Sequence, residues 1–485
     1  PSNPYQDTFI ERTNIHPLLP FPGDIITQGR WGNSIRFGST IKTKKNQIPL
    51  NLWSEGTSTS GDPILIIRNG QGTQTNEGWI PIEEEINNDD ASIYFTSTQK
   101  KDLLAILERN PNKKVLIIDK EPEPGIHASG RNSGVLHAGF YYSPDSLKAK
   151  FCRLGNMELK NFCKENEIPI LETGKVVVCQ TKSDVTRLEE LYRRGIANGV
   201  DIEILDSSNL DKIEPAAKTI DKFIWSPTTA VGNPKVVITK LAEKFVKNGG
   251  HFQFNSAVKL ISTKDEVLIE TIHGTYSASS IINSAGAYAA DLAKQVNVGN
   301  QYVCLPFLGA YKKSKMVDSN PKRLVYPVPN PVNPFLGVHT TNTLNGEIKI
   351  GPTAFPVIGK EQYSFTNGFS SNEFKDFLKA SMSLIKSDSV ELVGLAKEEF
   401  MKLYTKPLLK RTEKLSGSLT RNKNWRKHPA GIRAQIINTE TNSIEMDYIV
   451  ESQKNVVHIL NAVSPGWTSA IPFTRWVVEN QPLLR

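Results

Sequence analysis

The hydrophobic pattern divides the chain into two parts of different texture. Up to about residue 100, short apolar runs at Ser34–Phe37, Pro63–Arg68 and Ser92–Phe95 alternate with turns rich in Asn, Gly, Thr, Ser and Pro. Short apolar runs between turn residues are typical of β-strands, and helical periodicity is absent from this stretch. The sequence therefore predicts a small β-rich or irregular segment over residues 1–100.

A different pattern begins near Lys101. Apolar residues recur at helical spacing over Asp102–Arg109, and the apolar run Val115–Ile118 predicts a buried strand. Pro234–Asn248 predicts an amphipathic helix, and Ser280–Ala285 predicts a strand that enters a glycine turn. Alternating helices and apolar strands are typical of an α/β nucleotide-binding core.

Interleaved β-rich stretches predict a second, mixed sheet that covers the substrate. They are Lys175–Gln180, Val303–Lys313 and Glu347–Gly351. The expected fold class is thus α/β, with an α+β substrate domain. We assign residues 101–155, 215–300 and 425–485 to the nucleotide-binding domain, and residues 156–214 and 301–424 to the substrate domain.

Composition narrows the class of protein. With 485 residues, 38% hydrophobic and 22% charged, the chain is expected to be a globular protein of two or three domains. Neither an apolar run of ~20 residues nor a basic, then apolar leader is present. The net charge of +8 is spread thinly, which favours a solvated basic surface over nucleic-acid binding. Four cysteines without close spacing argue against a metal site and against a disulfide framework. We therefore expect a cytoplasmic protein, with peripheral membrane association left open.

The segment His127–Tyr142, HASGRNSGVLHAGFYY, sets three glycines among small and polar residues. Such glycines let the backbone approach a phosphate or a ring closely. This segment resembles the signature of the L-2-hydroxyglutarate dehydrogenases, within the FAD-dependent enzymes related to D-amino-acid oxidase. Similar segments follow in order along the chain: SLKAKFCRLG (146–155), IINSAGAYAADL (281–292), YPVPNPVNPFLGVHTT (326–341), GPTA (351–354), PAGIRAQ (429–435) and NAVSPGWTSA (461–470).

The resemblance implies FAD as the cofactor and a small 2-hydroxyacid as the substrate, with an unidentified electron acceptor. An acidic residue after the second strand of a dinucleotide fold hydrogen-bonds the ribose, which suits Asp119, although such a residue is more often part of a turn. The expected cofactor-binding residues are Asp119, Lys120, Ser129, Gly130, Arg131, Asn132, Ser133, Gly134, Val258, Ala285, Gly286, Gly431, Ser464, Pro465, Gly466 and Thr468.

The chemistry of hydroxyacid oxidation suggests catalytic residues. A base that titrates near neutrality must take the hydroxyl proton, and His137 and His339 are the candidates, each as easily a structural histidine. Arg433 offers a fork-shaped cation for a carboxylate, with a packing ion pair as its alternative role. Tyr326 could donate a hydrogen bond to the substrate, or belong to the core. Around Gly309 the sequence FLGAY lacks the charged residues usual in the family, which weakens the assignment of the substrate.

The largest departure from the family lies upstream. A strand, a G-x-G-x-x-G turn and a helix are expected to hold the diphosphate. Yet Ser92–Lys101, SIYFTSTQKK, contains no glycine, and Gly70 and Gly72 precede no helical pattern. We infer that unrelated sequence was joined near Gln99–Lys101, as a natural fusion or an error of sequence assembly.

Three hypotheses follow. The chain is a working flavoenzyme that converts L-2-hydroxyglutarate to 2-oxoglutarate, or a chimera with impaired FAD binding. The third is a structural protein of a virion, because stretches such as Gly29–Thr40 and Gly61–Gly72 loosely resemble a virion protein of tailed cyanophages. Oxygen, a quinone and an electron-transfer protein all stay open as the electron acceptor.

Overall fold

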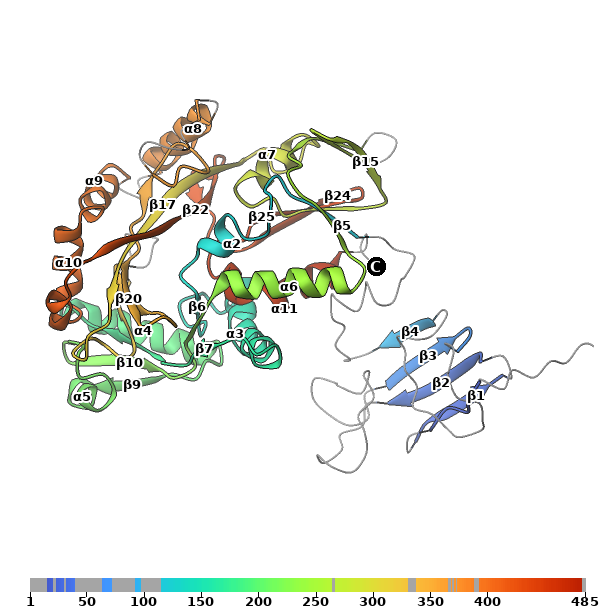
Figure 1. Cartoon of the computed structure of the whole chain (residues 1–485), viewed down its shortest axis with the longest axis horizontal. Helices are drawn as coiled ribbons and strands as arrows, with labels where there is room; N and C mark the ends of the chain where they lie inside the picture. The colour runs from blue at the N-terminus through green and yellow to red at the C-terminus, as the bar shows by residue number, and fades with distance from the viewer. Residues whose placement is uncertain are drawn as a thin grey trace, which may run out of the picture. The chain divides into compact units, whose positions relative to one another are not determined.

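The structure is a computed structural model that describes residues 15–20, 23–29, 32–39, 63–71, 92–96, 115–263, 267–329, 337–364, 368, 370–371, 373–387 and 392–481. Contacts divide the chain into two compact units, Pro1–Lys114 and Val115–Arg485 (Figure 1). The predicted helix Asp102–Arg109 and the junction at Gln99–Lys101 lie outside the described residues.

The first unit contains a four-stranded antiparallel sheet with the order β1-β2-β3-β4. Its strands are β1 (Ile25–Gln28), β2 (Ser34–Ser39), β3 (Pro63–Arg68) and β4 (Ser92–Thr96). Arg36 is fully buried on one face and pairs with Asp24, while its neighbour Phe37 points to the exposed face. The predicted β-rich segment is therefore confirmed.

The second unit is mixed α/β, as predicted. Its strands are β5 (Leu116–Ile118), β6 (Val135–Leu136), β7 (Ile170–Leu171), β8 (Lys175–Val178), β9 (Glu203–Asp206), β10 (Lys222–Ser226), β11 (Ala230–Gly232), β12 (His251–Gln253), β13 (Val258–Ser262), β14 (Val267–Thr271), β15 (Gly274–Ala278), β16 (Ile281–Asn283), β17 (Tyr302–Lys315), β18 (Leu324–Pro327), β19 (His339–Asn342), β20 (Glu347–Gly351), β21 (Phe355–Pro356), β22 (Arg426–Asn438), β23 (Ser443–Ile444), β24 (Ile449–Gln453) and β25 (Val456–Asn461).

Its α-helices are α2 (Ala128–Arg131), α3 (Leu147–Glu165), α4 (Ser183–Ala197), α5 (Leu210–Ile213), α6 (Pro234–Lys247), α7 (Ala289–Lys294), α8 (Phe374–Lys386), α9 (Leu392–Lys402), α10 (Thr405–Glu413) and α11 (Gly466–Asn480). Three 3-10 turns, η1 (Ser207–Asn209), η2 (Gly286–Tyr288) and η3 (Gly417–Arg421), complete the description. Among the described helices, none has both the length and the apolar character needed to cross a membrane.

Local sequence accounts for the ends of the long helices. The Asn233 side chain accepts a hydrogen bond from the Lys235 N–H, and Pro234 occupies the first turn of α6, where its missing N–H costs nothing. The Ser146 side chain caps α3 in the same way. Helices α3 and α11 cross closely, because a Cβ at Gly155 would lie 2.1 Å from the Thr468 carbonyl oxygen.

Two sheets form most of the interior. Six strands make the larger sheet, in which β17 and β22 lie side by side as long antiparallel strands (Figure 1). The other sheet has the order β18-β8-β10-β9, with β18 parallel to β8. All four residues of β8 are buried, and so are those of β18. These sheets include the predicted β-rich stretches, and β22 joins the larger one although its residues belong to the predicted nucleotide-binding segments.

Two parallel pairings of the second unit, which a doubly wound fold would place in one sheet, lie in separate small sheets. Strand β5 pairs with β12, and β16 pairs with β25. Among the described residues, β5 and β16 each have a partner on one edge alone. Their apolar side chains are unusually accessible, with Leu116 41% and Ile282 43% exposed. A doubly wound sheet buries such strands on both sides. The sequences of β5 and β16 are therefore typical of interior strands, although each has an edge without a neighbour among the described residues.

Candidate active site

His137 follows β6 and is held by its backbone. Its N–H donates to Thr468 Oγ1 at 3.1 Å, and its carbonyl oxygen accepts from Asn156 Nδ2 at 3.2 Å. The side chain is buried, and Nδ1 has no hydrogen-bond partner among the described residues. Burial lowers the pKa of His137 well below its usual value, with further lowering by Lys175, His339 and Arg433. A neutral imidazole with an unused nitrogen therefore lies next to three other cation-forming groups.

His339 is the other candidate base and is positioned differently. Its Nδ1 lies 2.8 Å from the Gly337 carbonyl oxygen, which assigns the proton to Nδ1 and leaves Nε2 as a proton acceptor. Its ring stacks on Tyr326 with centroids 3.7 Å apart. Burial lowers the pKa of His339 to about 3, the bond to Gly337 raises it, and Lys175 and Lys349 lower it. The ring is thus fixed in orientation and tautomer.

Arg433 lies on β22 opposite Phe307 of β17 and is partly buried. Its charge acts on His137, and the pKa of Arg433 is lowered by burial and raised by Tyr142 and Tyr311. The structure therefore brings His137, His339 and Arg433 together, with Tyr326 stacked on one of the histidines. Their catalytic roles stay predictions.

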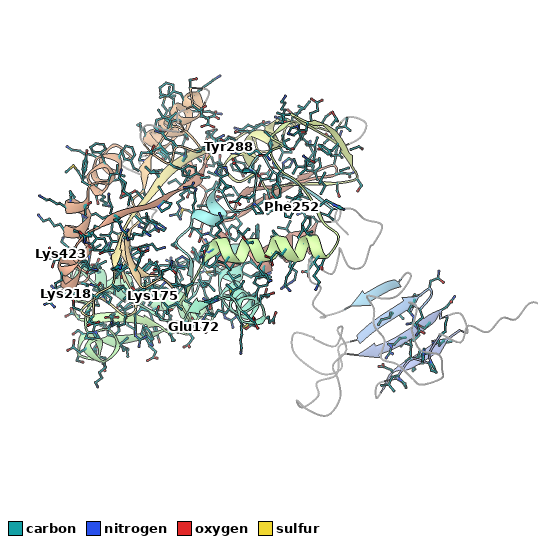
Figure 2. The ribbon with its side chains drawn as sticks, viewed as in Figure 1. Glu172, Lys175, Lys218, Phe252, Tyr288 and Lys423 are labelled. Carbon is teal, nitrogen blue, oxygen red and sulfur yellow. The ribbon has the colours of Figure 1, made fainter. Side chains whose placement is uncertain are left out.

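Sequence reasoning missed two buried lysines in the same place. Lys175 begins β8, and Lys349 on β20 donates to the Ser133 carbonyl oxygen at 2.9 Å. Burial lowers the pKa of Lys175 to about 7 and that of Lys349 to about 8. Figure 2 labels Lys175 within the second unit. The available signal was a lysine directly after Gly174 in a strand that is otherwise entirely apolar.

The departure at Phe307–Tyr311 is filled by packing. Phe307 is buried in a cluster with Leu305, and Leu308 packs against Val357 and Ile432. Apolar side chains thus occupy positions where the family usually carries charge.

The segment that carries the glycine signature is tightly built. Asn132 Nδ2 donates to the Ser129 carbonyl oxygen at 2.8 Å, and Asn132 Oδ1 accepts from the Gly134 N–H at 3.0 Å. Gly134 has φ +79°, and a Cβ there would lie 2.4 Å from the Gly232 carbonyl oxygen. A Cβ at Gly130 would lie 2.0 Å from another backbone oxygen. These glycines are therefore required for close backbone contact, whatever else the segment binds.

Arg131 ties this segment to the larger sheet. Its guanidinium donates to the carbonyl oxygens of Ile126 at 2.7 Å and Ala430 at 3.2 Å. A Cβ at Gly431 would lie 2.9 Å from the Arg131 carbonyl oxygen. Helix α2 and strand β22 are therefore closely packed. The role of Arg131 in cofactor binding stays a prediction.

Asp119 lies directly after β5, as predicted. Its Oδ1 accepts from the Glu121 N–H at 2.9 Å, so one carboxylate oxygen is used in the turn. Lys120 lies 2.5 Å from carboxylate oxygens of both Glu121 and Glu361. Glu121, Glu361 and His127 are close enough to share a metal ion, but the Lys120 ammonium already pairs with both carboxylates.

The other predicted cofactor residues lie at the start of β13, in the turn after β16 and at the start of α11. Val258 begins β13, and Ala285 and Gly286 form the turn after β16, where a Cβ at Gly286 would meet nothing within 4 Å. Thr468 is buried in the first turn of α11 and donates to the Val135 carbonyl oxygen at 3.2 Å. Ser464, Pro465 and Gly466 lead into this helix.

These residues fit an FAD ring better than they fit its diphosphate. On the ring side, the His137 backbone is bonded to Thr468 in the first turn of α11, and its side-chain Nδ1 is buried with no hydrogen-bond partner among the described residues. On the phosphate side, a G-x-G-x-x-G turn would stand between β5 and β16, where each strand has an unpaired edge among the described residues. The residues predicted for the ring side therefore lie together, whereas the usual backbone cradle for the diphosphate is absent from the part of the chain described.

Comparisons with known proteins agree with this geometry. The family described as FAD dependent oxidoreductase matches residues 103–480. An L-2-hydroxyglutarate dehydrogenase of Indibacter alkaliphilus is 34% identical over 78% of this chain and 94% of its own length. The enzyme of that name from Escherichia coli K12 is 32% identical over 78% and 89%.

Among solved structures, an L-alpha-glycerophosphate oxidase from Mycoplasma pneumoniae superposes with a TM-score of 0.60. It is 22% identical and covers 79% of this chain and 91% of that chain, which establishes the shared fold. The resemblance of residues 1–100 to a virion protein stays a prediction. From about residue 103 onward, the chain belongs to the family of FAD-dependent oxidoreductases.

Proposed function

We propose that this protein oxidises L-2-hydroxyglutarate to 2-oxoglutarate. The observation that carries the proposal is the group of cation-forming side chains made by buried Lys175, His137 and His339 and partly buried Arg433. A buried cationic site is suited to an organic acid, because charge-assisted hydrogen bonds offset the cost of burying both partners. The L-2-hydroxyglutarate dehydrogenases that are similar to this chain cover most of its length, which supports L-2-hydroxyglutarate over other acids.

The residues suggest a division of labour. Arg433 binds the carboxylate next to the hydroxyl group and orients C2. His339 Nε2 accepts the hydroxyl proton, because the Gly337 carbonyl oxygen holds the other ring nitrogen in its protonated form. Burial keeps this ring neutral, with a pKa of about 3 instead of the near-neutral value expected from the sequence, so its tautomer and position favour it as the base, and its pKa does not. FAD, when bound, accepts the hydride that leaves C2. Tyr326 supports the His339 ring by stacking, and Thr468 holds the His137 backbone beside it.

We further propose the domain division given above, in which residues 101–155, 215–300 and 425–485 hold the cofactor and residues 156–214 and 301–424 cover the substrate. A reducing compartment such as the cytoplasm fits the four cysteines, all of which are free and buried.

A substrate panel tests the proposal. The full chain, supplied with FAD and an artificial electron-accepting dye, is offered L-2-hydroxyglutarate, its D-enantiomer, L-lactate and glycine. Selective turnover of L-2-hydroxyglutarate is the expected result. Turnover of lactate or glycine alone would replace the substrate assignment and leave the reaction class intact.

A second candidate is a family member that retains FAD weakly. Among the described residues, β5 and β16 each have one unpaired edge, and this favours weak FAD binding. In a dinucleotide fold, the strand and glycine turn that hold the diphosphate would lie between two such edges. Flavin content after purification, and after soaking with FAD, separates the two. A folded protein that stays colourless in excess FAD would establish the second candidate.

A further inference from the structure

Lys175 is a buried lysine without a hydrogen-bond acceptor. Its side chain has 0% exposure, and Nζ has no partner among the described residues. Three aromatic rings surround the ammonium, with ring centroids at 4.6 Å for Phe140, 4.7 Å for Tyr141 and 4.9 Å for Tyr326. Aromatic faces attract a cation, but they replace only part of its hydration.

The charges around Lys175 add to this cost. His137 and His339 both lie within its electrostatic reach and become cations when protonated. Cys152 is the one acidic group that acts on Lys175 in the part described, and burial raises the pKa of its thiol to about 12, so it is neutral. A buried cation beside other cation-forming groups needs an anion that arrives from outside.

Arg433 alone would satisfy one carboxylate. It lies on β22 of the larger sheet, whereas Lys175 lies on β8 of the four-stranded sheet. Both act on the charge of His137, so cations from two different sheets lie near this histidine. A substrate with two carboxylates would be held at both ends by such a pair.

We propose that Lys175 binds the distal carboxylate of the substrate and so selects dicarboxylic over monocarboxylic hydroxyacids. This inference rests on the proposed function and names the group that sets its substrate class. The ammonium and the carboxylate form a charge-assisted hydrogen bond within the aromatic enclosure of Phe140, Tyr141 and Tyr326. A monocarboxylate would leave the ammonium unpaired, and its affinity would suffer accordingly.

Binding should also be coupled to protonation. Among the described residues, the titratable groups in contact with Lys175 or acting on it are Tyr141, Tyr326 of β18, His137, His339 of β19 and Cys152 of α3, and none of these supplies a negative charge near neutrality. Because burial lowers the pKa of Lys175 to about 7, the free site is partly neutral at that pH. A dicarboxylate therefore takes up a proton on binding, and its affinity falls as the pH rises above about 7.

Calorimetric titration with glutarate and pentanoate tests the proposal without turnover, because these ligands differ only in the distal carboxylate. The full chain with saturating FAD should bind glutarate about 10- to 100-fold more tightly, as expected for one charge-assisted bond. Lys175→Met should abolish this preference and Lys175→Arg should retain part of it. Lys222→Met, at an exposed ion pair on neighbouring β10, should leave the preference unchanged.

The outcomes are distinct. Equal affinities of the wild-type chain for both ligands, or a full preference in Lys175→Met, would overturn the inference. Lys175→Met should unfold at the same or a higher temperature, whereas a purely structural lysine would give a lower one. If that variant fails to fold, the preference of the wild-type chain for glutarate over pentanoate is measured from pH 6 to pH 9. A preference that disappears as the pH rises supports the inference, and one that stays constant overturns it. A retained preference without oxidation of L-2-hydroxyglutarate would refute the proposed function alone.

Discussion

Arg433 and Arg426 lie on the same strand, β22, and differ in burial and in partners. Arg426 is exposed and pairs with Glu347, whereas Arg433 is partly buried and acts on His137. We expect Arg433→Ala to lower kcat/KM for L-2-hydroxyglutarate about 100-fold or more, mainly through KM, since a bidentate carboxylate contact is lost. Arg426→Ala is the matched control, and steady-state kinetics measure both. Unchanged kinetics in Arg433→Ala would remove this residue from the site.

The two buried histidines are expected to differ in effect. His339 has a fixed tautomer with Nε2 available, so His339→Ala should slow reduction of the flavin about 100-fold, the usual contribution of a general base. His137→Ala should have a smaller effect, because the hydrogen bonds of His137 to Thr468 and Asn156 are made by its backbone, which alanine retains. Stopped-flow absorbance measures the reduction step.

His273→Ala serves as the control for both variants, since that residue is exposed and far along the chain from either histidine. A larger loss in His137→Ala would exchange the roles of the two histidines. If the rate falls in neither variant, another group accepts the proton.

At the scale of single elements, the glycine signature has a structural cost that can be measured. Gly134→Ala places a side chain on a backbone with φ +79°, which L-residues rarely adopt, and its Cβ would lie 2.4 Å from the Gly232 carbonyl oxygen. We expect a loss of about 1–3 kcal/mol in the free energy of unfolding. Gly466→Ala is the control, because a Cβ there meets nothing within 4 Å and alanine favours the helix. Denaturant titration compares the two, and equal stability would contradict the packing described.

Several elements could be predicted from local pattern. The strands β5, β8 and β20 and helix α6 lie where apolar runs, caps and periodicity indicate them, because these signals act within a few residues. The position of Lys175 could not be predicted, since a lysine at the start of a strand normally reaches solvent. Its burial results from the parallel pairing of β8 with β18, about 150 residues away in sequence, and from the rings of Phe140 and Tyr326.

The same contrast holds for the candidate site. Motifs identified His137, His339, Arg433 and Tyr326, and the fold brings these residues together. The motifs could not show that the guanidinium of Arg131 is bonded to two backbone carbonyls, because one of these belongs to Ala430 on a distant strand. Long-range contacts of this kind decide whether a polar side chain is available to a ligand.

At the scale of the whole molecule, β5 and β16 are edge strands among the described residues, and this predicts weak binding of FAD. Replacing residues 1–101 with a strand followed by G-x-G-x-x-G should tighten FAD binding about tenfold or more, since fixed N–H donors would then meet the diphosphate. Quenching of flavin fluorescence measures the dissociation constant. A graft with serines at the three glycines is the control, and equal affinity of all three proteins would show that the phosphate site is supplied elsewhere.

Anaerobic reduction of the bound flavin tests the central claim most directly. The full chain is saturated with FAD, freed of excess cofactor and mixed with L-2-hydroxyglutarate in the absence of any acceptor. Stoichiometric bleaching of the flavin's visible absorption, with one 2-oxoglutarate formed per flavin, is the predicted result. A protein that holds FAD and keeps its full absorption in the presence of this acid would contradict the account.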